Sequence, residues 1–187
     1  MAHIEIIPYE KAKGELKEIY DHLIDTRGKL AEVHKVQSLN PRTILKHMDL
    51  YMEIMYGKSP LKRVQREIVA TVVSVTNKCT YCIEHHAEAV QYYWKNEERL
   101  EALKQDYRSA KLLKSEDALC NYAELLTLSP EKTKDGEEVE KLKRHGWSER
   151  QILDTTLVVA YFNFVNRIVL SLGLDIEEDG AAGYDYE

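Results

Sequence analysis

The sequence has almost no strand signals. Its one dense run of β-branched residues, EIVATVVSVT at 67–76, continues an apolar pattern at helical spacing, through Val64, Ile68, Val72 and Val75. No internal repeat is evident. We therefore expect an all-α protein.

Segments that bind nucleic acid or enter a membrane are also missing. The formal net charge is -6 and the acidic and basic residues are mixed along the chain, so no basic stripe is available to attract a polyanion. The first residues have no apolar run long enough for a secretion signal. The longest apolar stretch, LVVAYFNFVNRIVLSLGL at 157–174, carries Asn163, Asn166 and Arg167, which favours a buried helix over a membrane span. We expect neither nucleic acid nor membrane as a partner.

Cysteine is scarce as well, with three in 187 residues. Without an export signal this number fits a reducing cytoplasm, where a closely spaced pair is more often catalytic or metal-binding than structural. Cys79 and Cys82 form such a pair. Cys120 stands alone in SEDALCNYAELL and is expected in the core.

With 44% hydrophobic residues, the chain can form one compact domain, which we place at 1–174. The tail DIEEDGAAGYDYE at 175–187 is acidic and contains glycine, so we expect it to be flexible. The caps and prolines predict helices. They include a capping box from Ser148 to Gln151 and a start at Ser59-Pro60. The predicted ranges are 9–25, 41–56, 60–75, 77–94, 96–106, 115–127, 135–145 and 149–172.

The stretch TNKCTYCIEHHAEAV at 76–90 carries the chemistry. On a helix capped by Thr76 or Asn77, Cys79, Cys82 and His86 share one face. His85 lies to one side and is expected to be a structural or solvent-facing neighbour. Both cysteines then occupy the first turns, where free N–H groups and the helix dipole favour a thiolate. Such a pair can be oxidised by peroxide to a sulfenic acid and then to a disulfide, and an imidazole can transfer the protons.

The preceding helix contributes Glu67, Thr71 and Ser74 as a polar stripe among apolar residues. A tight connection at 76–77 makes the two helices a hairpin, so Glu67 can face the middle of the second helix. In an apolar setting its pKa is expected to rise, and it can then relay protons to the dithiol.

These residues resemble a known signature. Glu67, Cys79, Cys82 and His86 follow the pattern E-x11-C-x2-C-x3-H of the alkylhydroperoxidase D family, within the carboxymuconolactone decarboxylase superfamily. The stretches SLNPRTILKHMDLYMEIMYG and GWSERQILDTTLVVAYFNFVNR are similar to the peroxidase-related branch of that family. The resemblance therefore covers most of the chain. It departs at Tyr81, where well-known members have a further histidine.

The resemblance implies a multi-helix bundle whose central hairpin carries the C-x-x-C motif. It also implies a homo-oligomer that reduces alkyl hydroperoxides or hydrogen peroxide without haem, flavin or metal. Cys79, Cys82, His86 and Glu67 would be the catalytic residues. A dithiol reductant, thioredoxin-like or lipoyl-bearing, would restore the thiols. Which cysteine attacks the peroxide stays open, because the start of the helix favours Cys79 and the spacing to His86 favours Cys82.

Other interpretations also stay open. In one interpretation, the two cysteines are simply small buried hydrophobic residues; in another, they hold zinc together with His86 and Glu67. In a third interpretation, the protein is a redox sensor or scaffold that uses the dithiol without catalytic turnover. In a fourth, it catalyses the decarboxylase reaction of the wider superfamily. For Glu67, the alternative to a catalytic role is a surface ion pair with Arg63 or Arg66. The polar residues Asn163, Asn166 and Arg167 brace a subunit interface or line the approach to the dithiol.

Overall fold

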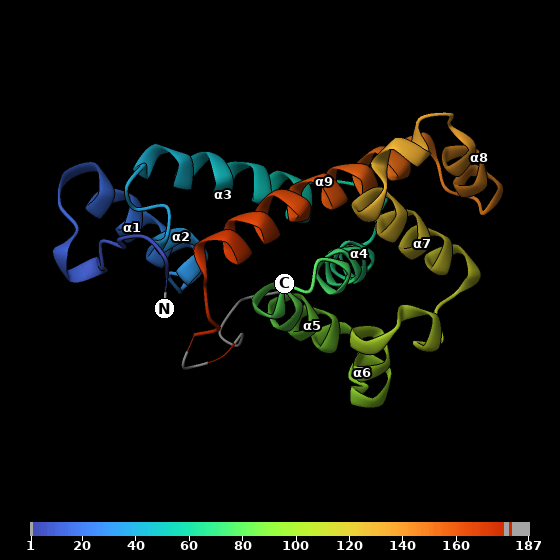
Figure 1. Cartoon of the computed structure of the whole chain (residues 1–187), viewed down its shortest axis with the longest axis horizontal. Helices are drawn as coiled ribbons and strands as arrows, with labels where there is room; N and C mark the ends of the chain where they lie inside the picture. Colours follow the sequence, from blue (N-terminus) through green and yellow to red (C-terminus); the bar gives the residue numbers. More distant parts are fainter. Residues whose placement is uncertain (1, 178–179, 181–187) are drawn as a thin grey trace.

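The computed structural model describes residues 2–177 and 180, and this part of the chain is all-helical, as predicted. Short 3-10 helices are η1 (Tyr9–Lys11), η2 (Tyr107–Ser109) and η3 (Pro130–Thr133). The α-helices, shown in Figure 1, are α1 (Gly14–Arg27), α2 (Glu32–Lys35), α3 (Pro41–Tyr56), α4 (Arg63–Thr76), α5 (Thr80–Trp94), α6 (Glu97–Gln105), α7 (Lys114–Leu128), α8 (Glu137–Arg144) and α9 (Glu149–Leu172).

Most helix boundaries follow the sequence signals. The capping box of α9 is present, with the Ser148 hydroxyl accepting from the backbone N–H of Gln151. Gly173 ends this helix at φ 67°, a left-handed conformation that glycine adopts at little cost. The predicted start at Ser59-Pro60 is wrong, because α4 begins at Arg63. The Ser59 hydroxyl instead accepts from the backbone N–H of Leu61 and donates to Asp154 on α9.

Helix α4 is the centre of the fold. It packs against α5, α7 and α9, and Figure 1 shows it in the middle of the molecule with these helices around it. Every residue from Gln65 to Ser74 is buried, so the polar stripe of Glu67, Thr71 and Ser74 lies inside the fold. Arg66 is buried too, and its guanidinium donates to the carbonyls of Ile54 and Gly57, tying the end of α3 to α4.

Helices α1 and α2 form the end of the molecule opposite α7 and α8, and α3 runs from that end toward the middle (Figure 1). A separate small core holds α1 against α3, with Tyr20 and Ile44 fully buried in it. Helix α9 connects this end to the main core, because it packs along α3, α4 and α7. The N-terminal helices therefore close one side of any site formed between α4, α5 and α9.

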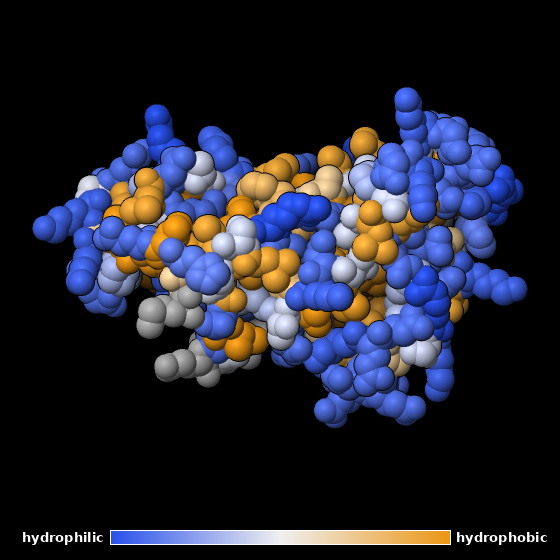
Figure 2. All heavy atoms as spheres, viewed as in Figure 1, coloured by the Kyte–Doolittle hydropathy of each residue, from blue (hydrophilic) through white to orange (hydrophobic). Residues whose placement is uncertain are grey.

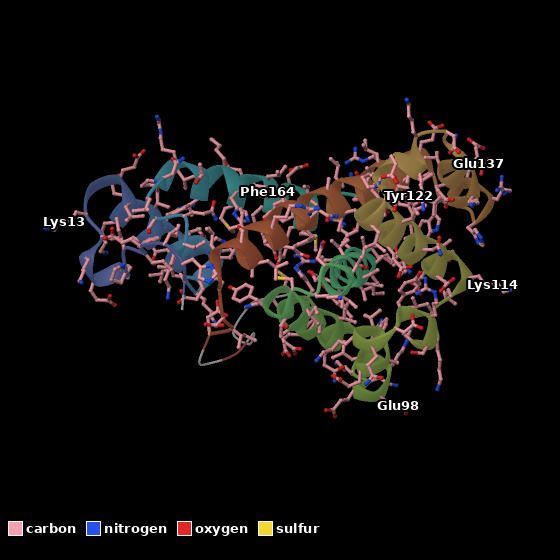
Figure 3. The ribbon with its side chains drawn as sticks, in the orientation of Figure 1. Lys13, Glu98, Lys114, Tyr122, Glu137 and Phe164 are labelled. Carbon is pink, nitrogen blue, oxygen red and sulfur yellow. The ribbon has the colours of Figure 1, made fainter. Side chains whose placement is uncertain are left out.

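Helix α9 is the one helix in the described residues with the length and apolar character of a membrane span. Its inner face is buried in the bundle and includes the polar residues Asp154, Thr155 and Asn166. Its outer face exposes Leu153, Leu157 and Phe164. Figure 2 shows hydrophobic side chains gathered over the middle of the molecule, where α3 and α9 lie. Phe164, labelled in Figure 3, also makes an edge contact with the His47 ring of α3.

Candidate active site

The dithiol sits at the start of α5, slightly earlier in the helix than predicted. Asn77 ends α4 and Cys79 is the N-cap of α5, so neither Thr76 nor Asn77 caps this helix. Lys78 turns the chain between the two helices with φ 57°. Cys82 lies in the first turn, and its Sγ is 2.9 Å from the Sγ of Cys79. Both thiols are free and buried, and they lie close enough to join with little movement of either side chain.

The two thiols share their protons unequally. The hydrogen bond from the Cys82 thiol lowers the pKa of Cys79, although burial opposes this shift. The same hydrogen bond raises the pKa of Cys82, and burial raises it further. A single negative charge on the pair is therefore favoured at Cys79, next to the free N–H groups of the helix start.

Glu67 and His86 meet across the hairpin, as the spacing predicted. The Glu67 carboxylate is 2.8 Å from Nδ1 of His86 and 2.8 Å from Nε of Arg63. Arg63 is thus an internal partner of a carboxylate that is 1% exposed, so the surface ion pair considered from the sequence is in fact buried. Arg66 faces the end of α3 and takes no part.

The expectation of a raised Glu67 pKa is wrong. Burial does act to raise the pKa of Glu67, but His86 and Arg63 together outweigh it and the pKa falls. Glu67 is therefore a carboxylate and can only accept hydrogen bonds. His86 must donate from Nδ1, so a proton taken up by the neutral form of the ring would bind at Nε2. The His86 ring also packs edge-on against Phe162 of α9, at 4.2 Å between ring centroids.

The polar residues of α9 stabilise the turn before the dithiol. Asn166 is fully buried, and its Oδ1 accepts from Asn77 at 3.0 Å. Asn163 accepts from the same amide at 3.1 Å. A hydrogen bond from Asn166 also acts to lower the pKa of Cys82, against the larger raising effects. Asn166 thus lies beside the dithiol, whereas Arg167 is exposed and bonds to Asn163.

Glu177 contacts two residues of the motif segment, Tyr81 and His85, and the sequence analysis did not identify it. Its carboxylate accepts from the Tyr81 hydroxyl at 2.7 Å and the Glu32 backbone N–H at 3.1 Å, and lies 2.9 Å from Nε2 of His85. Glu177 therefore departs from the expectation of a flexible tail; residues 178–179 and 181–187 of that tail lie outside the described residues. His85 is half-buried and bonded rather than solvent-facing. An acidic, glycine-containing segment gives no signal of such a contact.

Glu177 yields a test of its role in stability. Burial opposes ionisation, but His85 and Tyr81 dominate and lower the pKa of Glu177 to about 2. We expect Glu177→Gln to lower the free energy of unfolding by about 1 kcal/mol at pH 7, a value reduced by solvent screening. The contribution is present above the unfolded pKa of about 4.5 and is lost as the pH falls toward 2. Urea unfolding of both proteins from pH 8 to 3 measures it. A difference independent of pH would contradict this account.

An apolar cavity of about 100 Å³ adjoins the dithiol. Cys82, His86 and Glu67 line it, together with aromatic rings from α3 and α9 that include Tyr51 and Tyr161. Cys79 lines a separate hollow with the end of α9, near Leu170 and Gly173. Cys82 thus lines the same cavity as the Glu67–His86 pair, whereas Cys79 lines the other hollow.

The zinc alternative has little geometric support. No group of three His, Cys, Asp or Glu side chains within residues 2–177 and 180 is spaced to hold a metal ion. The Glu67 carboxylate already contacts both Arg63 and His86. Cys120 is buried in the core, as predicted, and burial raises its pKa.

The part of the chain that contains the motif is similar to a known protein family. Residues 44–107, which include the whole motif, match the model of the carboxymuconolactone decarboxylase family. The protein YdfG of Bacillus subtilis is 28% identical over 122 residues, which cover 65% of this chain and 82% of YdfG.

Solved structures are similar over nearly the whole chain. A peroxidase-related protein of Silicibacter sp. TM1040 is 25% identical, with a TM-score of 0.84 over 96% of this chain and 94% of its own. A peroxidase-related protein of Ralstonia eutropha, described as an alkylhydroperoxidase AhpD core, is 17% identical, with a TM-score of 0.84 over 95% and 93%. The debrominase Bmp8, in a complex with 2,3,4-tribromopyrrole, is 19% identical with a TM-score of 0.76 over 95% of both chains. Residues 44–107 are thus similar to the carboxymuconolactone decarboxylase family, and the chain has the fold of these alkylhydroperoxidase D-like structures.

Proposed function

We propose that the chain is a thiol-dependent peroxidase that reduces alkyl hydroperoxides or hydrogen peroxide through a Cys79–Cys82 disulfide cycle. The observation that carries the proposal is the 2.9 Å approach of the two sulfurs beside an imidazole oriented by a buried carboxylate. A dithiol this close can take up two oxidising equivalents, and the imidazole can move the proton that each step requires. The cycle needs no haem, flavin or metal.

The first step takes place at Cys82, which lines the cavity with His86. Nε2 of His86 accepts the Cys82 proton, and the thiolate attacks one peroxide oxygen as the O–O bond breaks. The leaving alkoxide or hydroxide takes the proton back from His86. The products are an alcohol or water and a sulfenic acid on Cys82.

The second step uses the low pKa of Cys79. Its thiolate attacks the sulfur of the Cys82 sulfenic acid, the S–S bond forms, and the leaving hydroxide takes up a proton to become water. A thioredoxin-like or lipoyl dithiol then reduces the disulfide by exchange, starting at Cys79, which lines the separate hollow at the end of α9. A reducing compartment such as the cytoplasm would supply this reductant.

Turnover separates this proposal from a redox sensor. We would measure consumption of cumene hydroperoxide and of hydrogen peroxide by the reduced protein, with thioredoxin or dihydrolipoamide as the electron donor. A peroxidase consumes many equivalents with at least one donor. A sensor would consume one equivalent and then stop with every donor.

Reductive removal of bromine from an aromatic ring is a second candidate, favoured by the aromatic cavity beside Cys82. In that reaction the dithiol supplies two electrons, hydrogen replaces the halogen, and hydrogen bromide and the disulfide form. Bromide release from 2,3,4-tribromopyrrole, measured beside peroxide consumption, decides between the two activities.

We also propose that the chain forms a homo-oligomer through the outer face of α9. Leu153, Leu157 and Phe164 follow one another along this face and are 53%, 42% and 48% exposed. Apolar stripes of this kind on a soluble helix usually meet another surface. We expect this surface to contact a second copy of the chain, because the sequence resemblance implies a homo-oligomer.

Leu157→Glu tests this interface. A buried carboxylate without a partner opposes association, so we expect the variant to be a monomer at micromolar concentration. Light scattering of the wild type, this variant and Leu113→Glu measures the mass. Leu113 is 66% exposed but lies at the start of α7, away from the stripe. A monomeric wild type, or equal masses for all three proteins, would rule out the interface.

A further inference from the structure

Two histidines that line the cavity, His34 and His47, take no part in the proposed chemistry. His34, from the short helix α2, lines the cavity and is 8% exposed. Its ring makes no hydrogen bond with any residue in the described part of the chain, and Nδ1 is also cut off from solvent. A buried imidazole without a partner is costly, and native structures rarely keep one without a reason. His34 precedes residues 44–107 and so lies outside the matched family domain.

A second histidine beside His34 has a defined hydrogen-bonding state. Gln37 donates from Nε2 both to the carbonyl of Val33 and to Nδ1 of His47, each at 2.8 Å. Because the Val33 carbonyl can only accept, Nε2 of Gln37 is the donor in both hydrogen bonds. His47 therefore accepts at Nδ1 and carries its proton on Nε2. The rings of His34 and His47 are in edge contact, with centroids 5.7 Å apart.

Both histidines are neutral. Burial lowers the pKa of His34 to about 3 and that of His47 to about 4. Of the charged groups that line the cavity, the Glu67 carboxylate is paired with Arg63, and the Arg27 guanidinium donates to the Tyr56 hydroxyl and lies over the Tyr56 ring. An uncharged ligand group can hydrogen-bond to the neutral His34 imidazole.

The rest of the cavity suits a flat, apolar body. Its walls are mostly aromatic, and the rings of His47 and Tyr161 meet edge-on at 5.6 Å between centroids. The volume of about 100 Å³ is of the same order as cavities that hold benzene, which measure about 150 Å³. Cys82 and His34 both line this cavity.

We propose that this cavity binds a small, uncharged aromatic molecule carrying one hydroxyl or N–H group, and that His34 hydrogen-bonds to that group. The inference rests on the proposed function and specifies its substrate class, since the ring would be the organic part of the molecule reduced at Cys82. His34 then acts as a specificity residue supplied by the N-terminal segment.

Phenol and toluene are the probes, because they are similar in size and only phenol has a hydroxyl. Their dissociation constants are measured by NMR titration of reduced wild type, His34→Phe and His22→Phe. Phenylalanine keeps a ring at position 34 and removes both nitrogens, and His22 is exposed on α1. We expect His34→Phe to weaken phenol binding about fivefold to tenfold, the effect of one lost hydrogen bond. Toluene binding should be unchanged or tighter, and His22→Phe should match the wild type.

Thermal unfolding provides the second readout. Because His34 has no partner in the free protein, His34→Phe should not lower the melting temperature. A lower melting temperature with unchanged phenol binding would make His34 a structural residue and overturn the proposal. Equal affinity of the wild type for phenol and toluene, or no binding of either, would overturn it as well. If His34→Phe does not fold, His34→Leu replaces it.

The proposed function is tested separately by turnover of hydrogen peroxide by the wild type. If the wild type does not turn over hydrogen peroxide but binds phenol selectively, the proposed peroxidase function is overturned and the proposed binding site stands. If it turns over hydrogen peroxide but does not bind phenol selectively, the peroxidase function stands and the binding-site proposal is overturned.

Discussion

Replacing Cys82 by serine is expected to abolish peroxide turnover, with a loss of at least about 1,000-fold in kcat/KM. Cys82 is the sulfur that shares the apolar cavity with His86 and Glu67. A serine hydroxyl is a far weaker nucleophile and cannot form the sulfenic acid. Steady-state peroxide consumption with a dithiol donor measures the loss.

Cys79→Ser should fail at a different stage. The variant still reacts once with peroxide, but its Cys82 sulfenic acid has no partner and persists, so a sulfenic-acid trap such as dimedone labels it. Cys120→Ala is the matched control and should keep the activity, because Cys120 is buried in the core away from the cavity. Labelling of Cys79 in the Cys82→Ser protein, with none in Cys79→Ser, would reverse the two roles.

Glu67→Gln is expected to reduce both activity and stability. Without the carboxylate, His86 loses the group that fixes its tautomer and favours its protonated form, which should lower kcat/KM by about 100-fold or more. Arg63 would keep a buried charge without its counterion, so the free energy of unfolding should fall by about 3 kcal/mol. Kinetics and urea unfolding measure the two effects.

A double variant separates the two effects. Arg63→Gln combined with Glu67→Gln removes both charges, so most of the lost stability should return. The activity should stay low, because His86 still lacks its carboxylate. If activity recovered with stability, Glu67 would act only as a structural residue.

The sequence predicted the parts of the site that depend on spacing along helices. Glu67 and His86 are 19 residues apart, yet the helical repeat and the short turn place them in contact. Cys79 and Cys82 approach each other for the same reason. Asn166 stood out because a polar residue on an apolar helix needs a partner, and it has partners beside the dithiol.

Features that depend on tertiary contacts were not predicted. The direction of the Glu67 pKa shift is set by Arg63 and His86 acting together, whereas the sequence suggested only burial. His34 lies on a helix of four residues, too short for a periodic pattern. Glu177 lies in a segment whose composition indicates disorder, and its position depends on Tyr81 and His85.

Titration of the reduced protein with peroxide, followed by thiol counting and peptide mass analysis, tests the central claim most directly. We predict that one equivalent of peroxide removes two thiols per chain, that the product is a disulfide between Cys79 and Cys82, and that Cys120 remains free. Survival of the Cys79 and Cys82 thiols in excess peroxide, or a disulfide that includes Cys120, would contradict the account.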